Sequence, residues 1–108
     1  MSQRDENVID VARDFSPTPG GRYRSEGKWS GEEFREDLLE PRLSETTGPV
    51  YVELDDAEGF TTSFLEEVFG GIVRKIGARE ARRVVPRASS IPSRQEKALY
   101  YMRRAGMK

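Results

Sequence analysis

The chain has 108 residues, of which 35% are hydrophobic and 34% are charged, and its formal net charge is −1. Its length suits one domain with a single core, and its apolar residues come in blocks, unlike those of a disordered protein. The absence of cysteine excludes disulfides and thiolate chemistry, and the absence of histidine removes the commonest general base and metal ligand. We therefore expect a non-enzymatic protein without a cofactor or a bound metal.

Charge is distributed unevenly along the chain. Residues 1–73 carry seven basic and seventeen acidic side chains, whereas residues 74–108 carry eleven basic and two acidic ones. In the simpler interpretation, which we prefer, the two parts neutralise each other in the fold. In the alternative, the basic part forms a face for an acidic partner or for nucleic acid.

Residues 1–6 are polar and are predicted to be disordered, and residues 7–108 are predicted to form one domain. Apolar periodicity and turn signals predict a strand, a hairpin-like turn, a helix, a strand, a helix, a strand and a helix. These elements are expected over 7–14, 16–27, 30–41, 50–54, 63–77, 82–86 and 92–105. Such alternation predicts an α/β fold, in which helices pack on a mixed sheet of about four strands.

Two capping boxes mark the starts of the first two predicted helices. In each box a serine hydroxyl accepts from a backbone N–H three residues later, and a glutamate reaches back; the pairs are Ser30 with Glu33 and Ser63 with Glu66. Pro41 does not fit an undisturbed helix interior, so the first helix is expected to end or kink near it.

Glycine and proline add further local constraints. Gly70 and Gly71 interrupt an otherwise apolar helix, which predicts a close backbone approach to a strand. Gly77 is expected to cap that helix at its C-terminal end. Pro86 places the strand at 82–86 at an edge of the sheet, since proline cannot donate to a ladder.

The first candidate site is the segment Thr61, Thr62, Ser63 and Phe64, which follows an acidic turn and opens a helix. Backbone N–H groups at a helix start favour an anion, so a phosphate on Ser63 would be stabilised there. In the simpler alternative, Ser63 is only a helix cap.

The second candidate site combines Gly20 and Gly21 with Arg22 and Arg24. A glycine-rich turn flanked by arginine can hold a phosphate or a carboxylate. The spacing is not that of a phosphate-binding P-loop, and a hairpin turn with solvated arginines is the alternative.

Two charged segments complete the candidates. Asp55, Asp56 and Glu58 could attract a hard cation, but their spacing fits an ordinary solvated turn better than a calcium loop. The C-terminal third could contact nucleic acid, because Tyr100 and Tyr101 lie among its basic residues. Those residues are Arg82, Arg83, Arg87, Arg94, Lys97, Arg103, Arg104 and Lys108. The alternative is a solvated helix face.

Several of these motifs occur in the same order in a known family. They are Asp14-Phe15-Ser16-Pro17, Pro19-Gly20-Gly21-Arg22-Tyr23, Ser30-Gly31-Glu32-Glu33-Phe34-Arg35 and the segment from Gly59 to Gly71. Together they resemble the bacterial STAS-like family of unknown function over roughly residues 8–77.

The resemblance implies a relative of STAS domains, the fold of anti-sigma factor antagonists. In those domains an Asp-Ser-Ser-Gly-Leu-type motif opens a helix, and a partner kinase of the histidine-kinase ATPase type phosphorylates the second serine. Ser63 falls on that serine and Leu65 on the leucine, while Thr61, Thr62 and Phe64 replace the remaining residues.

We therefore expect a cytoplasmic regulatory module that binds a protein, namely an ATPase-type kinase or an anti-sigma-like regulator. No apolar run approaches the length of a membrane span, and the first ten residues lack a signal-peptide pattern. The alternative function is nucleic-acid binding by the basic C-terminal third.

Overall fold

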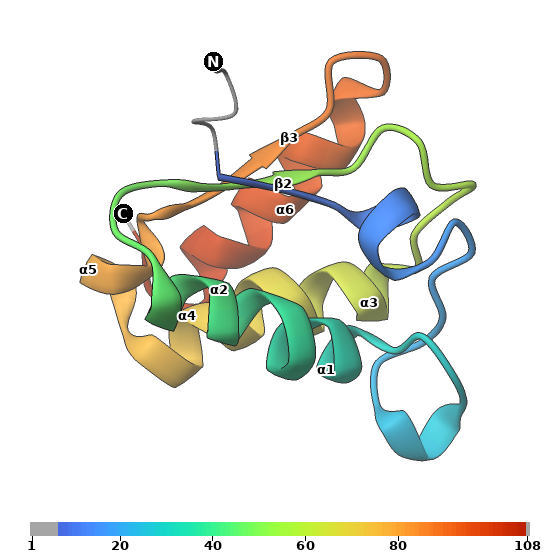
Figure 1. Ribbon diagram of the computed structural model, residues 1–108, viewed down its shortest axis with the longest axis horizontal. Coiled ribbons are helices and arrows are strands. Elements are labelled where there is room, and N and C mark those ends of the chain that lie inside the picture. Colours follow the sequence, from blue (N-terminus) through green and yellow to red (C-terminus); the bar gives the residue numbers. More distant parts are fainter. Residues whose placement is uncertain (1–6, 108) are drawn as a thin grey trace.

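The computed structural model describes residues 7–107 (Figure 1), so the predicted disordered segment 1–6 lies outside the described residues. Its three strands are β1 (Val8–Asp10), β2 (Val50–Glu53) and β3 (Val84–Arg87), in the order β1-β2-β3. Both pairings are parallel. The α/β prediction is confirmed, but the predicted mixed sheet of about four strands is wrong, because the described chain forms three strands and all are parallel.

The predicted first strand is shorter than expected because its own residue caps a helical turn. β1 ends at Asp10, whose carboxylate accepts from the backbone N–H groups of Ala12 and Arg13. The chain then forms a π-helical turn over Val11–Phe15. This local hydrogen bonding competes with continued strand pairing.

The predicted hairpin is also absent. The Gly20 N–H donates to the carbonyl of Trp29, and the Gly31 N–H donates to the carbonyl of Gly21. The intervening loop contains a short 3₁₀-helix over Arg24–Glu26. The turn signals are therefore real, but they fold the loop against itself and against a helix start without adding strands to the sheet.

The first long helix runs through α1 (Gly31–Phe34), a π-helical turn (Arg35–Leu39) and α2 (Glu40–Glu45). The Ser30 hydroxyl accepts from the Glu33 N–H as predicted, at 3.0 Å, whereas the Glu33 carboxylate accepts from the N–H of Trp29. The helix does not end near Pro41; its hydrogen bonding widens to the π pattern just before this residue, which lacks an N–H.

The second long helix runs through α3 (Thr62–Leu65), a π-helical turn (Glu66–Gly70) and α4 (Gly71–Ile76). Gly77 ends it with φ of 90°, which confirms the predicted cap. The short α5 (Ala78–Ala81) follows, and α6 (Pro92–Arg104) confirms the predicted last helix.

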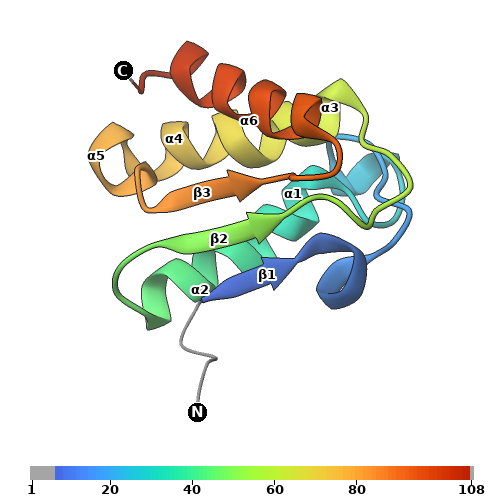
Figure 2. The ribbon, with the colours of Figure 1, turned by 90° about the horizontal axis from the view of Figure 1, so that it is seen from above.

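The two long helices lie side by side against one face of the sheet, and α6 flanks β3 and packs on the second long helix (Figures 1 and 2). Strand residues alternate between the two faces. The inward ones are buried beneath these helices; they are Ile9, Val50, Val52, Val84 and Pro86. Phe34, Phe64 and Phe69 fill the core between sheet and helices, each fully buried.

Side chains and proline occupy the two outer edges of the sheet. On the free side of β1, the Val8 carbonyl accepts from the Arg42 guanidinium at 3.3 Å, and the Asp10 N–H donates to Asp14 at 2.8 Å. β3 lies at the opposite edge, as Pro86 predicted, and Pro86 has no N–H to offer there.

Candidate functional site

The N-cap of the second long helix lies two residues earlier than predicted. Thr61 is the N-cap, and its hydroxyl accepts from the backbone N–H of Phe64 at 3.0 Å. Ser63 is the second residue of the helix, so the predicted capping box of Ser63 with Glu66 is wrong. The Glu66 side chain points to arginines instead.

Segment 61–64 divides into an outer and an inner part. Thr61 and Thr62 are exposed and Ser63 is half-buried. Within residues 7–107, the hydroxyls of Thr62 and Ser63 make no hydrogen bond. Phe64 is fully buried, with its ring centroid 5.4 Å from that of Phe60, so the prediction that Phe64 contacts a partner does not fit its position.

The structure brings the two predicted sites together. The Thr61 hydroxyl donates to the carbonyl of Gly20 at 3.2 Å, so the glycine turn lies directly beside the start of the helix. A Cβ at position 20 would lie 2.5 Å from the carbonyl oxygen of Lys28, and only glycine fits this approach.

Trp29 stands next to this contact. Its carbonyl accepts from the Gly20 N–H, and its φ of 63° places a bulky residue in the left-handed region. The indole is 40% exposed and packs edge-on against Phe15, with a centroid distance of 5.4 Å. Such backbone strain is concentrated at functional sites in folded proteins.

Arg22 is bound to the second long helix. Its guanidinium lies 2.5 Å from Glu66 and 3.4 Å from Glu67, and the hydrogen bond to Glu66 raises the pKa of Arg22. Glu66 also accepts from Arg74 at 2.6 Å. This hydrogen bond lowers the pKa of Glu66, and the hydrogen bond from Arg22 lowers it further by a smaller amount.

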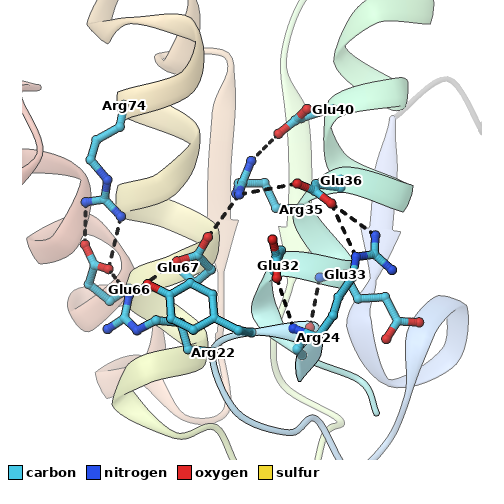
Figure 3. Close-up of polar contacts among 12 residues, drawn as sticks. Arg22, Arg24, Glu32, Glu33, Arg35, Glu36, Glu40, Glu66, Glu67 and Arg74 are labelled. Atoms are coloured by element: carbon cyan, nitrogen blue, oxygen red, sulfur yellow. Dashed lines mark hydrogen bonds and ion pairs between the residues drawn. The ribbon is translucent and has the colours of Figure 1, made fainter. Parts of the chain in front are cut away.

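Arg24 is bound to the first long helix, where it lies 3.2 Å from Glu36 (Figure 3) and 2.8 Å from Asp37. The loop therefore straps across both helices through two arginines. Since both guanidiniums already bind carboxylates of the chain, the predicted anion site at Gly20, Gly21, Arg22 and Arg24 is not a free cradle.

Arg35 joins the two long helices from within. It is only 9% exposed, and its guanidinium binds Glu67 at 3.0 Å and also Glu40 (Figure 3). Burial alone lowers the pKa of Arg35, but the hydrogen bonds to Glu67 and Glu40 more than compensate, so this pKa is raised. An open hollow of about 370 Å³ lies beside it, bordered by Tyr23.

The Gly70-Gly71 pair makes room for this network. A Cβ on Gly71 would lie 2.9 Å from the Arg35 Nε, and a Cβ on Gly70 would meet the Glu66 carboxylate. The predicted close approach is therefore to side chains of the ion network and not to a strand. The Arg35 Nε is buried without a hydrogen-bond partner in the described chain.

Sequence reasoning missed the role of Arg35 and Glu67. Arg35 follows Phe34 on the inner side of the first long helix, and Glu67 lies among the apolar residues of the second. A charged residue on each apolar face, together with two glycines in mid-helix, is the signal that could have revealed a buried ion pair.

The acidic turn and part of the basic C-terminal third serve the fold. The Asp55 carboxylate accepts from the N–H groups of Ser89, Ser90 and Ile91. The Arg94 guanidinium donates to four carbonyls in and beside this turn, including that of Leu54 at 2.6 Å. No group of acidic side chains within residues 7–107 is arranged to hold a metal ion.

Arg83 likewise donates to the carbonyls of Leu43, Thr46 and Gly48. Other cations remain exposed without an ion pair among the described residues; they are Lys75, Arg79, Arg82, Lys97, Arg103 and Arg104. The charge asymmetry is thus neutralised only in part.

No helix in the described part of the chain has the length and apolarity needed to cross a membrane. Neither the curated proteins nor the solved structures contained a match to the chain. A family model described as a STAS-like domain of unknown function matches residues 30–85. This range is just over half of the chain, and it spans both long helices and segment 61–64. The chain belongs to this STAS-like family of unknown function.

Proposed function

We propose that the chain is a regulatory module that binds a protein through the start of the second long helix. One observation carries the proposal. Thr61, Thr62 and Ser63 present three hydroxyls at one exposed helix end, and those of Thr62 and Ser63 have no partner within the described residues. The nearby Arg22 and Arg24 are already bound to carboxylates, whereas these two hydroxyls are available to a partner.

Trp29 supports a protein as the partner. It is joined to Thr61 through Gly20, because Gly20 bonds to both residues, and its indole is 40% exposed. Tryptophan is enriched among the residues that dominate the binding energy of protein interfaces. Hydroxyls beside an exposed indole provide both polar contacts and an aromatic anchor.

The proposal includes phosphorylation of Ser63 by an ATPase-type kinase, which the family resemblance suggests, with an anti-sigma-like regulator as the other candidate partner. Glu66 and Glu67 follow Ser63 at helical spacings of three and four residues, on the same side of the helix. A phosphate on Ser63 would therefore compete with both carboxylates for Arg22. Phosphorylation would loosen the strap at the contact surface.

The phosphorylation test is incubation with a candidate histidine-kinase-type ATPase and ATP, followed by mass spectrometry of the intact chain and its peptides. We expect one phosphate on Ser63 and none on Ser63→Ala. Ser93→Ala is the matched control, because Ser93 is accessible to a kinase and, like Ser63, occupies the second position of a helix. Equal modification of wild type and Ser63→Ala would refute the phospho-switch.

Binding is tested separately by calorimetric titration with the same ATPase in the absence of ATP. We expect Trp29→Ala to weaken binding at least tenfold, as truncation of an interface anchor does. Tyr100→Ala is the control, because Tyr100 is also an exposed aromatic residue, 50% exposed, and lies on another helix, α6. Equal affinities of the two variants would show that the contact surface lies elsewhere.

A second candidate function is nucleic-acid binding by the outer face of α6. Tyr100 is exposed there, next to the exposed Lys97, Arg103 and Arg104, and the Arg104 guanidinium lies 6.0 Å from the Tyr100 ring centre. Binding of single-stranded DNA would weaken steeply with salt as counterions are released. A flat salt dependence, or no binding at low salt, would exclude this function.

A further inference from the structure

The outer face of the sheet is uncovered. Figure 2 looks onto this face, and no helix of the described chain lies over the strands. Sheets made only of parallel strands almost always have both faces covered, since their residues are apolar on both sides. The sheet of this chain is covered on one side only, by the long helices and α6.

Strand register arranges the outer residues in two rows. The first row is apolar and aromatic; it consists of Val8, Tyr51 and Val85. The second row is charged; it consists of Asp10, Glu53 and Arg87. The Arg87 guanidinium lies 4.7 Å from the Tyr51 ring centre and 3.6 Å from the Glu53 carboxylate, so the rows are linked. All six residues are half-buried.

We propose that a second copy of this chain covers this face, with the two sheets packed face to face about a two-fold axis that runs along β2. This axis reverses the strand order, so β1 of one copy lies over β3 of the other. Val8 then faces Val85 of the partner subunit, and Tyr51 faces the partner's Tyr51. Asp10 faces the partner's Arg87, which pairs opposite charges at both outer strands.

The two rows select this axis over the alternative. A two-fold axis perpendicular to the strands would place the apolar row of one copy over the charged row of the other, which desolvates charges without partners. The axis along β2 keeps apolar over apolar and charged over charged. Of the three charged residues in the row, only Glu53 faces its own counterpart, and it keeps Arg87 of its own chain at 3.6 Å.

The small area predicts a weak dimer. The face is three strands wide, well below the extent of a standard interface, so we expect a dissociation constant of about 0.1 mM. Sedimentation equilibrium from about 10 µM to about 1 mM spans this value. Tyr51→Glu should weaken association at least tenfold, and Tyr100→Glu should leave it unchanged. Glu53→Gln should strengthen it, because it removes the one like-charge contact.

Cross-linking tests the register. The chain has no cysteine, so single-cysteine variants report only the introduced site. Facing sheets lie about 10 Å apart, which suits a bifunctional maleimide with a spacer of about that length. A mixture of Val8→Cys and Val85→Cys chains should cross-link several-fold more than either chain alone. Circular dichroism checks that each variant folds.

Any of three results would overturn the proposal. The first is a monomer at every concentration in sedimentation, which would leave the face to a different partner. The second is concentration-dependent association that Tyr51→Glu and Tyr100→Glu affect equally. The third is cross-linking of Val8→Cys alone that is as efficient as cross-linking of the mixture.

Discussion

Gly71→Ala tests whether the buried ion network dictates the glycine pair. In an isolated helix this change stabilises, because alanine is preferred over glycine by about 1 kcal/mol. Here the new methyl group would lie 2.9 Å from the Arg35 Nε, closer than van der Waals contact allows. Arg35 cannot step aside freely, because its guanidinium is bound to Glu67 and Glu40.

The sign of the effect follows from the two magnitudes. Overpacking of a filled interior costs about 1–3 kcal/mol, which exceeds the propensity gain of about 1 kcal/mol. We expect Gly71→Ala to destabilise the wild-type chain by about 1 kcal/mol. In an Arg35→Ala chain the obstacle is absent, and the same change should stabilise by about 1 kcal/mol. The coupling free energy between the two positions is then about 2 kcal/mol.

Urea unfolding of four chains measures this coupling: wild type, each single variant and the double variant. Arg35→Ala alone should cost about 3 kcal/mol, because it leaves the buried Glu67 short of a partner. Arg24→Ala is the control, since its ion pairs are exposed and contribute little to stability. Equal changes in the free energy of unfolding on Gly71→Ala in both backgrounds would show that Arg35 does not oppose a side chain at position 71.

Three further outcomes follow from contacts elsewhere in the chain. Thr61→Ala should lower the free energy of unfolding by about 1 kcal/mol, because it removes the helix cap. Ser63→Ala should change it by less than about 0.5 kcal/mol. A larger loss for Ser63→Ala than for Thr61→Ala in urea unfolding would identify Ser63 as the cap. The pKa of Glu66 is lowered in the fold, chiefly by its hydrogen bond to Arg74. The ionised Glu66 therefore stabilises the fold fully above the ordinary value of 4.5, and this stabilisation is lost as the pH falls through the lower pKa of the folded state. Glu66→Gln should accordingly make the free energy of unfolding depend less steeply on pH on the acid side. Arg94→Lys should lower the free energy of unfolding by about 1–2 kcal/mol, because one ammonium cannot reproduce the guanidinium fork that binds several carbonyls. An unchanged midpoint of thermal unfolding would contradict this expectation.

Local signals were sufficient for the elements whose determinants are adjacent in sequence. The β-branched and aromatic residues at the start of segment 50–54 form β2 over Val50–Glu53, and the caps at Ser30 and Gly77 form where predicted. The same reasoning failed for residues 7–27. There, Asp10 caps the next turn and so ends the strand, and Gly20 hydrogen-bonds to Trp29 across a loop. The periodicity of apolar residues predicts neither of these hydrogen-bonding patterns.

The candidate site could be located from the sequence but not described. Three consecutive hydroxyl residues can each cap a helix, and spacing alone does not distinguish Thr61, which caps it in the structure, from Thr62 and Ser63. The partners of Arg22 lie more than forty residues away, at Glu66 and Glu67. Such long-range ion pairs leave no trace in local spacing, so arginines that the chain itself neutralises looked available for a ligand.

The blocked edges of the sheet have a consequence for how the protein behaves at high concentration. A free strand edge is a template on which other chains add and polymerise. Here the Val8 carbonyl is bound to Arg42, the Asp10 N–H is bound to Asp14, and Pro86 removes a donor from the opposite edge. Growth into fibrils by lateral strand addition is therefore suppressed at both ends of the sheet, so concentrated solutions should remain free of cross-β aggregates as long as the fold is intact.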